Sequence, residues 1–135
     1  MIEKEFWVEG NAVSATYLEQ FGVFLGQLLL GKSAQSAPSQ RSIILRHTDP
    51  SYAGIMRQKL LDEEEMLKKQ NASYAFFPAE VRVDQGKMEV YLTGDRVAFA
   101  GGKQISLQKE CYILSFVYSG SRLLLKGVSF ERNNP

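Results

Sequence analysis

The first half of the chain carries apolar residues at helical spacing. Ser14 is suited to cap a helix. Apolar side chains then recur every three to four residues and form one stripe, which consists of Tyr17, Phe21, Phe24, Leu25 and Leu28. Gly31 follows the stripe and is expected to end this helix in a left-handed conformation.

Two further helices are predicted before residue 71. Pro38, at a first helical position, leads into a short second helix over 42–47. Thr48 or Asp49 then caps the longest helix, which has Pro50 in its first turn and Asn71 as its stop. This third helix is amphipathic, and its apolar stripe consists of Tyr52, Ile55, Met56, Leu60, Met66 and Leu67.

The apolar period changes to two after Asn71, which predicts β-strands. The turn signals are Asp84-Gln85-Gly86, Gly101-Gly102 and Ser119-Gly120-Ser121, so the pattern indicates a four-stranded antiparallel meander. The helices are expected to cover one face, because a sheet with an apolar face needs a second layer. The phase expected to be apolar throughout contains Val81, Val83, Met88, Val90, Leu92, Ile105, Leu107, Cys111 and Ile113.

Together these elements predict one α+β domain with a single core. Its parts are an N-terminal arm over 1–10, a helical part over 14–71 and the meander over 74–131. A chain of 135 residues is long enough to bury such a core without disulfides or metals. Because Phe6 is reached almost at once, we expect the natural chain to continue upstream of this sequence.

Composition disfavours some classes of function and excludes others. Sixteen basic residues face fifteen acidic ones, and a net charge of +1 gives no field that would attract nucleic acid or an anionic membrane. The single cysteine excludes an internal disulfide and a thiolate-based zinc site. No secretory signal is present, and the apolar stretch over 21–30 falls short of the about twenty residues that a membrane span needs.

Candidate chemistry is sparse. The acidic run over 62–65 points in several directions on a helix, which favours a solvated helix face over a metal site. His47 is the only histidine and lies near a helix end, where a capping or dipole role is favoured over catalysis. Cys111 lies in an alternating strand, where a buried small hydrophobe is favoured over a reactive thiol. We therefore expect no catalytic residue, no metal and no cofactor.

Aromatic residues gather at the start of the chain and in the predicted sheet. Both phases of the strands carry some of them, so the face that lacks helices is expected to expose a contact patch. Tyrosines are also ordinary strand residues, and this plainer interpretation stays open. The aromatic residues are Phe6, Trp7, Phe76, Phe77, Tyr91, Phe99, Tyr112, Phe116, Tyr118 and Phe130.

Three segments carry a likeness to a known family. They are SATYLEQFGVFL from residue 14, LLDEEEMLKKQNASYAFFPAEVRV from residue 60 and ECYILSF from residue 110. With their connections they resemble the TraE family of conjugative type IV secretion systems, relatives of the VirB-type inner-membrane assembly factor. The likeness extends from about Ser14 to Phe130. The family also has a short cytoplasmic tail and one N-terminal membrane helix, and we find no counterpart of either in this sequence.

The resemblance implies a nuclear-transport-factor-two-like or cystatin-like cone, with helices in the concave side of a curved antiparallel sheet. It also implies a non-enzymatic scaffold at the periplasmic face of the bacterial inner membrane. Such a domain would self-associate and contact other channel or pilus components, and the full-length protein would be anchored by an N-terminal helix. No active-site residue and no direct nucleic-acid contact is implied.

Our predicted protein-interaction surface combines the arm residues Phe6 and Trp7, the exposed side of the first helix, and the sheet residues Tyr91 and Tyr112. The alternative is a small-molecule-binding or isomerase-like domain of the same cone fold. A pocket that holds a carboxylate beside a tyrosine would favour it, the candidates being Asp84, Asp95 and Glu110. A nucleic-acid module would need a local basic patch, for which Arg41, Arg46, Arg57 and Lys59 are available.

Overall fold

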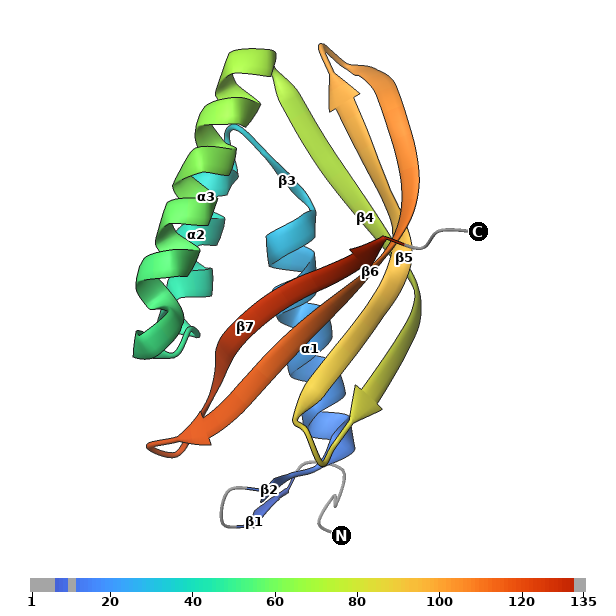
Figure 1. The fold of residues 1–135 in the computed structure, drawn as a ribbon. Coiled ribbons are helices and arrows are strands. Elements are labelled where there is room, and N and C mark those ends of the chain that lie inside the picture. Colours follow the sequence, from blue (N-terminus) through green and yellow to red (C-terminus); the bar gives the residue numbers. More distant parts are fainter. Residues whose placement is uncertain (1–6, 10–11, 133–135) are drawn as a thin grey trace, which may run out of the picture.

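A computed structural model of the chain describes residues 7–9 and 12–132. It confirms the α+β class, with helices first and a curved antiparallel sheet second (Figure 1). The helices are α1 (Ala15–Leu30), α2 (Ala37–Arg46) and α3 (Pro50–Gln70). The main sheet has the order β3-β4-β5-β6-β7, built from β3 (Lys32–Ser33), β4 (Ala72–Asp84), β5 (Glu89–Ala100), β6 (Lys103–Ser119) and β7 (Arg122–Arg132). A separate small sheet pairs β1 (Val8–Glu9) with β2 (Ala12–Val13).

The main sheet has five strands, not the predicted four. The added strand is β3, whose Lys32 and Ser33 pair with Tyr74 and Ser73 at the start of β4. Two residues are too few to show an alternating pattern, so this strand gave no periodic signal. Gly31, just before it, has φ −113° and ψ 111° and is therefore extended, where a left-handed stop was predicted.

Local signals located most helix ends. The Ser14 side chain accepts a hydrogen bond from the Tyr17 amide at 3.2 Å, as an N-cap does. Asp49 caps α3 by accepting from the Ser51 amide at 3.1 Å, and Asn71 ends the helix with a left-handed φ of 49°. The second helix is longer than predicted, because it begins at Ala37 and has ten residues.

The buried face of α1 is rotated from the predicted stripe. Phe24 is 46% exposed, whereas the buried positions are Leu18, Gly22, Leu25, Gly26, Leu29 and Leu30. The two glycines let the helix lie directly on β5, since a Cβ on Gly22 would come 2.7 Å from Val90 Cγ1. In Figure 1, α1 accordingly lies inside the curve of the sheet.

The inward phase of β6 is the opposite of the predicted one. Ile105 and Leu107 are 61% and 56% exposed. The buried residues are instead Glu110, Tyr112, Leu114 and Phe116, while Cys111 is only half-buried. Both phases of this strand carry apolar residues over 111–117, so alternation alone could not decide which phase faces the helices.

A bulge shifts the alternation within β4. The register with β5 skips one residue between Pro78 and Glu80. Phe76 is therefore buried and Phe77 is 59% exposed, whereas Val81 and Val83, beyond the bulge, pack against the core.

Gly54, in the second turn of α3, offers a direct test of the helix. A Cβ there would meet nothing within 4 Å, so we expect Gly54→Ala to stabilise the protein by about 0.5–1 kcal/mol, the helix-propensity difference between the two residues. Gly120 also has open space but a φ of +59°, so Gly120→Ala should destabilise. Urea unfolding of both variants measures the contrast, and equal midpoints would contradict it.

Candidate functional site

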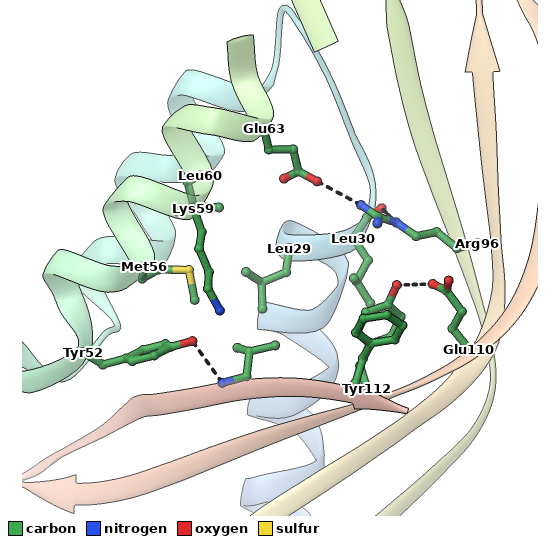
Figure 2. A pocket seen from close by; sticks show the side chains of 12 residues that line it. Leu29, Leu30, Tyr52, Met56, Lys59, Leu60, Glu63, Arg96, Glu110 and Tyr112 are labelled. Carbon is green, nitrogen blue, oxygen red and sulfur yellow. Dashed lines mark hydrogen bonds and ion pairs between the residues drawn. The ribbon is translucent and has the colours of Figure 1, made fainter. Parts of the chain in front are cut away.

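A groove of about 330 Å³ lies between helix α3 and the sheet (Figure 2). Its floor is built from core residues of α1, and its sides come from α3, β5, β6 and β7. Apolar groups make most of its lining, with a few charged groups toward one end. The lining residues are Leu29, Leu30, Tyr52, Met56, Lys59, Leu60, Glu63, Arg96, Glu110, Tyr112, Val128 and Phe130.

Glu63 holds one end of the groove closed. Its carboxylate forms ion pairs with Lys32 at 2.9 Å and with Arg96 at 3.3 Å, and so joins α3 to β3 and β5. The Lys32 side chain is only 2% exposed. Arg96 also donates to the Leu30 carbonyl at 3.1 Å, and its guanidinium lies 3.9 Å from the centre of the Tyr74 ring. Figure 2 shows the ion pair between Glu63 and Arg96, which joins helix α3 to the sheet.

A second polar pair, Glu110 and Tyr112, lies on β6. Both residues are 7% exposed, and the Tyr112 hydroxyl donates a hydrogen bond to the Glu110 carboxylate. Burial raises the pKa of this hydroxyl, and the bond to Glu110 raises it further. The Tyr112 ring is fixed edge-on to Phe76 and stacked on Phe130, at 5.9 and 5.5 Å between ring centres. The pair is thus rigid and protonated on the tyrosine.

Lys59 brings an unpaired cation to the groove. Its side chain extends from α3 toward the floor in Figure 2. Among residues 7–9 and 12–132 the structure gives its ammonium no ion pair or hydrogen bond. Lys32, Lys59 and Arg96 face two carboxylates, Glu63 and Glu110, so the cluster carries one net positive charge. This arrangement can attract an anionic group that is attached to an apolar body.

The residues predicted for protein contacts do not gather on one surface. Phe6 lies outside the described residues, and Trp7, beside the small β1–β2 sheet, is 41% exposed. Tyr91 is half-buried on the convex face, with Arg82 4.2 Å from its ring centre. Its hydroxyl donates to Glu89 at 2.8 Å, which raises the pKa of the hydroxyl. Tyr112 is on the opposite face and buried, so its predicted exposure is wrong; it shares the inward phase of Leu114 and Phe116.

The acidic run over 62–65 is not simply a solvated face. Glu63 forms the ion pairs described above, and Glu64 pairs with Arg41 at 2.6 Å, while Asp62 accepts from Gln58 at 2.9 Å. Within the described part of the chain, no group of three or more histidine, cysteine or acidic side chains could hold a metal ion.

His47 ends α2, as its position in the sequence suggested. Its ring is edge-on to Phe21 and Phe24, with ring centres 5.4 and 5.8 Å away. Burial lowers the pKa of the imidazole, and the nearby Arg122 and Arg46 lower it further.

A pH dependence of stability follows from this lowered pKa. Because the folded protein disfavours the protonated ring, stability should be full above pH about 6.5, the ordinary value, and should fall as the pH drops below it. We expect His47→Gln to flatten this loss between pH 7.5 and 5.5 in urea unfolding. Since the chain has one histidine, parallel curves for the two proteins would contradict the assignment.

Sequence reasoning missed how the groove is assembled. Glu63, Lys32 and Arg96 come from three elements that are far apart in sequence, and only the tertiary fold brings them together. Glu110 was named as a residue that would favour a pocket if it lay beside a tyrosine, and the structure places it there. Lys59 was assigned only to a basic patch. Its signal in sequence would have been its i, i+4 relation to Glu63 on α3.

Comparison with known proteins assigns the family. The family model described as TraE protein matches residues 1–130. Protein TraE of Escherichia coli is 28% identical over 88 residues, which cover 64% of this chain and 47% of that protein. Protein TraE of Escherichia coli strain K12 is 29% identical over 87 residues, which cover 63% of this chain and 46% of that protein. The chain thus spans about half the length of these relatives.

Solved structures share the fold. The VirB8 protein of Agrobacterium tumefaciens superposes with a TM-score of 0.70 at 8% identity, covering 90% of this chain and 94% of that one. A TraE protein in complex with 2-(2-furyl)isonicotinic acid superposes with a TM-score of 0.67 at 10% identity. The match covers 84% of this chain and 96% of that one. CagV, a VirB8 homolog of Helicobacter pylori, superposes with a TM-score of 0.62 at 8% identity. The match covers 87% of this chain and 98% of that one. Together with the family match along nearly the whole sequence, these findings show that the chain belongs to the TraE family.

Proposed function

We propose that the chain is a non-enzymatic scaffold domain of a conjugative type IV secretion system. The observation that carries the proposal is the family match over residues 1–130, on a fold shared with VirB8 and with a VirB8 homolog of a type IV secretion system. The polar groups of the groove support a structural role, because Glu63 and Glu110 are held by partners within the protein.

The proposed location is the periplasmic face of the bacterial inner membrane. In the described part of the chain no helix is long and apolar enough to span a bilayer. We propose that an N-terminal helix anchors the full-length protein in that membrane, as the membership of the TraE family suggests.

The proposed contacts are self-association and binding to other channel or pilus components. Exposed apolar side chains on α1 and on the convex face of the sheet support them. Trp7 and Tyr91 stay candidates from the predicted surface, and the structure adds Phe24, Phe77 and Leu107, which are 46%, 59% and 56% exposed.

Sedimentation equilibrium tests the proposal. The protein is measured over a wide concentration range, alone and with periplasmic domains of the same transfer system. We expect reversible self-association or a mixed complex, weakened in a Trp7→Ala, Tyr91→Ala double variant. Ile55→Ala removes an apolar side chain that is 55% exposed on α3 and is the control. If the protein stayed monomeric and bound none of the partners, the scaffold function would be refuted. If the double variant associated as well as the unchanged protein, only the surface containing Trp7 and Tyr91 would be refuted.

A second candidate is small-molecule binding in the groove. It is favoured by Glu110 beside Tyr112, and by the unpaired Lys59 above an apolar floor. One TraE protein was solved with 2-(2-furyl)isonicotinic acid, an aromatic carboxylic acid. Titration of that acid into the ¹⁵N-labelled protein should shift resonances around Lys59 if the candidate is right. Shifts that persist in Lys59→Gln, or that fall elsewhere, would reject it.

A further inference from the structure

The outer edge of β7 is open where it borders the groove. Near its start the edge is occupied, because Leu125 exchanges backbone hydrogen bonds of 2.7 Å with Asp49 and His47. The Val128 amide donates to the Tyr52 hydroxyl at 3.3 Å. From residue 129 to 132, β6 is the only strand that the described structure pairs with β7. This stretch therefore has an edge that no other described strand occupies, and Phe130 in it lines the groove.

We propose that the groove binds the C-terminal residue of an extended segment from another component of the secretion system. The segment would add as a strand to the open edge of β7 and lie beside α3. Main-chain hydrogen bonds would then supply affinity, and the groove would select the last side chain. This inference rests on the proposed scaffold function and names the class of partner.

The shape and lining of the groove suit one apolar side chain. Its volume of about 330 Å³ lies at the low end of the ~300–1,000 Å³ of ligand pockets. Leu29 of the floor, and Met56 and Leu60 of the α3 side, belong to the hydrophobic core and are therefore already held in place. Phe130 lies at the rim of the groove on the β7 side, and its side chain is 51% exposed. A bound side chain would therefore cover apolar surface of Phe130 that now faces water.

The charges of the groove favour a carboxylate on that residue. Glu63 is neutralised by two cations, and Glu110 accepts a hydrogen bond from Tyr112. Lys59 is the cation of the lining that has no partner among the described residues, and it extends toward the floor (Figure 2). A carboxylate attached to an apolar residue would meet the ammonium and the floor together.

The closed end of the groove favours a chain terminus over an internal segment. The Glu63–Arg96 ion pair joins α3 to β5 across this end, and the buried Lys32 supports it. In the proposed arrangement the segment enters from the β7 edge and ends before this contact, with its last residue beside Lys59. The residue in the groove would therefore be the last of its chain, and its carboxylate is the α-carboxylate.

Other open edges of the sheet carry features that oppose strand addition. The free edge of β4 contains Pro78 and a bulge. The part of β6 beyond β7 has Lys103 and Lys109 at its ends, and a bulge that leaves Ile105 unpaired with β5. Lysine, proline and bulges are the usual means by which edges avoid pairing. The edge of β7 over 129–132 contains neither proline nor bulge and adjoins a pocket.

A peptide pool tests the inference without a known partner. The pool contains acetylated pentapeptides with four randomised positions and a final Leu or Phe, prepared as free acids and as amides. Binding to the ¹⁵N-labelled protein is followed by amide resonances. The free acids should shift Ser129 to Glu131 and Lys59, and the amides should bind about tenfold more weakly or worse, as expected for loss of a charge-assisted hydrogen bond.

Substitutions of Lys59 complete the test. Lys59→Gln should weaken the free acids about tenfold and leave the amides unchanged, whereas Lys59→Arg should retain binding. Lys69→Gln, which changes an exposed lysine ten residues further along α3, is the matched control.

Equal binding of acids and amides, or no binding by the pool, would overturn the inference. If the aromatic acid alone shifts Lys59, the groove is a small-molecule site. Mixed complexes that form normally with Lys59→Gln would leave the scaffold function standing and reject this site.

Discussion

Replacing Glu63 by alanine is expected to destabilise the protein by about 3 kcal/mol. The substitution leaves two cations without a counter-charge, and one of them, Lys32, has a side chain only 2% exposed. Removing one partner of a buried ion pair typically costs about 3–5 kcal/mol, and the lower end applies because Glu63 itself is 23% exposed. The free energy of unfolding from urea titration measures the effect.

Two other variants separate charge from packing. Glu65→Ala removes a neighbouring carboxylate that is exposed and unpaired within the described residues, so stability should change by less than about 0.5 kcal/mol. Adding Lys32→Met to Glu63→Ala should recover part of the loss, because the buried ammonium disappears along with its partner. If Glu63→Ala proved as mild as Glu65→Ala, the ion-pair cluster would not be what holds α3 against the sheet.

How far the sequence predicts this fold depends on the range of each signal. Helix ends at Ser14, Asp49 and Asn71 could be predicted, because a cap involves side chains and amides only two to four residues apart. The glycine turns at 101–102 and 120 could be predicted for the same reason, and each has the positive φ that glycine tolerates. These signals do not depend on the rest of the protein.

Burial was harder to predict, because it depends on what packs opposite. The helix α1 presents Gly22 and Gly26 to β5, yet a stripe sought among large apolar residues passes over glycines. In β6, Cys111 and Tyr112 belong to opposite phases that are both apolar, and only the packed structure shows that Tyr112 faces inward. The wrong phase placed Tyr112 on the predicted contact surface, whereas the structure places it in the lining of the groove.

The groove itself required tertiary information. Glu63 was visible as one member of an acidic run, but its partners Lys32 and Arg96 come from a two-residue strand and from β5. Neither partner carries a local signal that relates it to α3. The sequence could therefore predict an amphipathic third helix, and could not predict which of its carboxylates turns toward the sheet.

Gly94→Ala is expected to be the most damaging glycine substitution in the sheet. A Cβ at this position would collide with the Phe77 carbonyl oxygen and would lie 2.7 Å from the Cα of Pro78. These are backbone atoms next to the β4 bulge, so no rotamer change can relieve the contact. We expect a loss of about 3 kcal/mol, the upper part of the range for overpacking.

The position of Gly94 makes this result informative about the groove. Arg96 lies two residues further along β5, on the same face, so a strand forced away from Pro78 would also displace the guanidinium that meets Glu63. Gly127→Ala is the matched control, because its Cβ would meet only the Ser115 Cβ at 3.9 Å, an ordinary contact. Urea unfolding should show a large loss for Gly94→Ala and little change for Gly127→Ala. If the two variants were equally stable, the close approach of β5 to the bulge would be absent in solution, and the closed end of the groove would lose its structural basis.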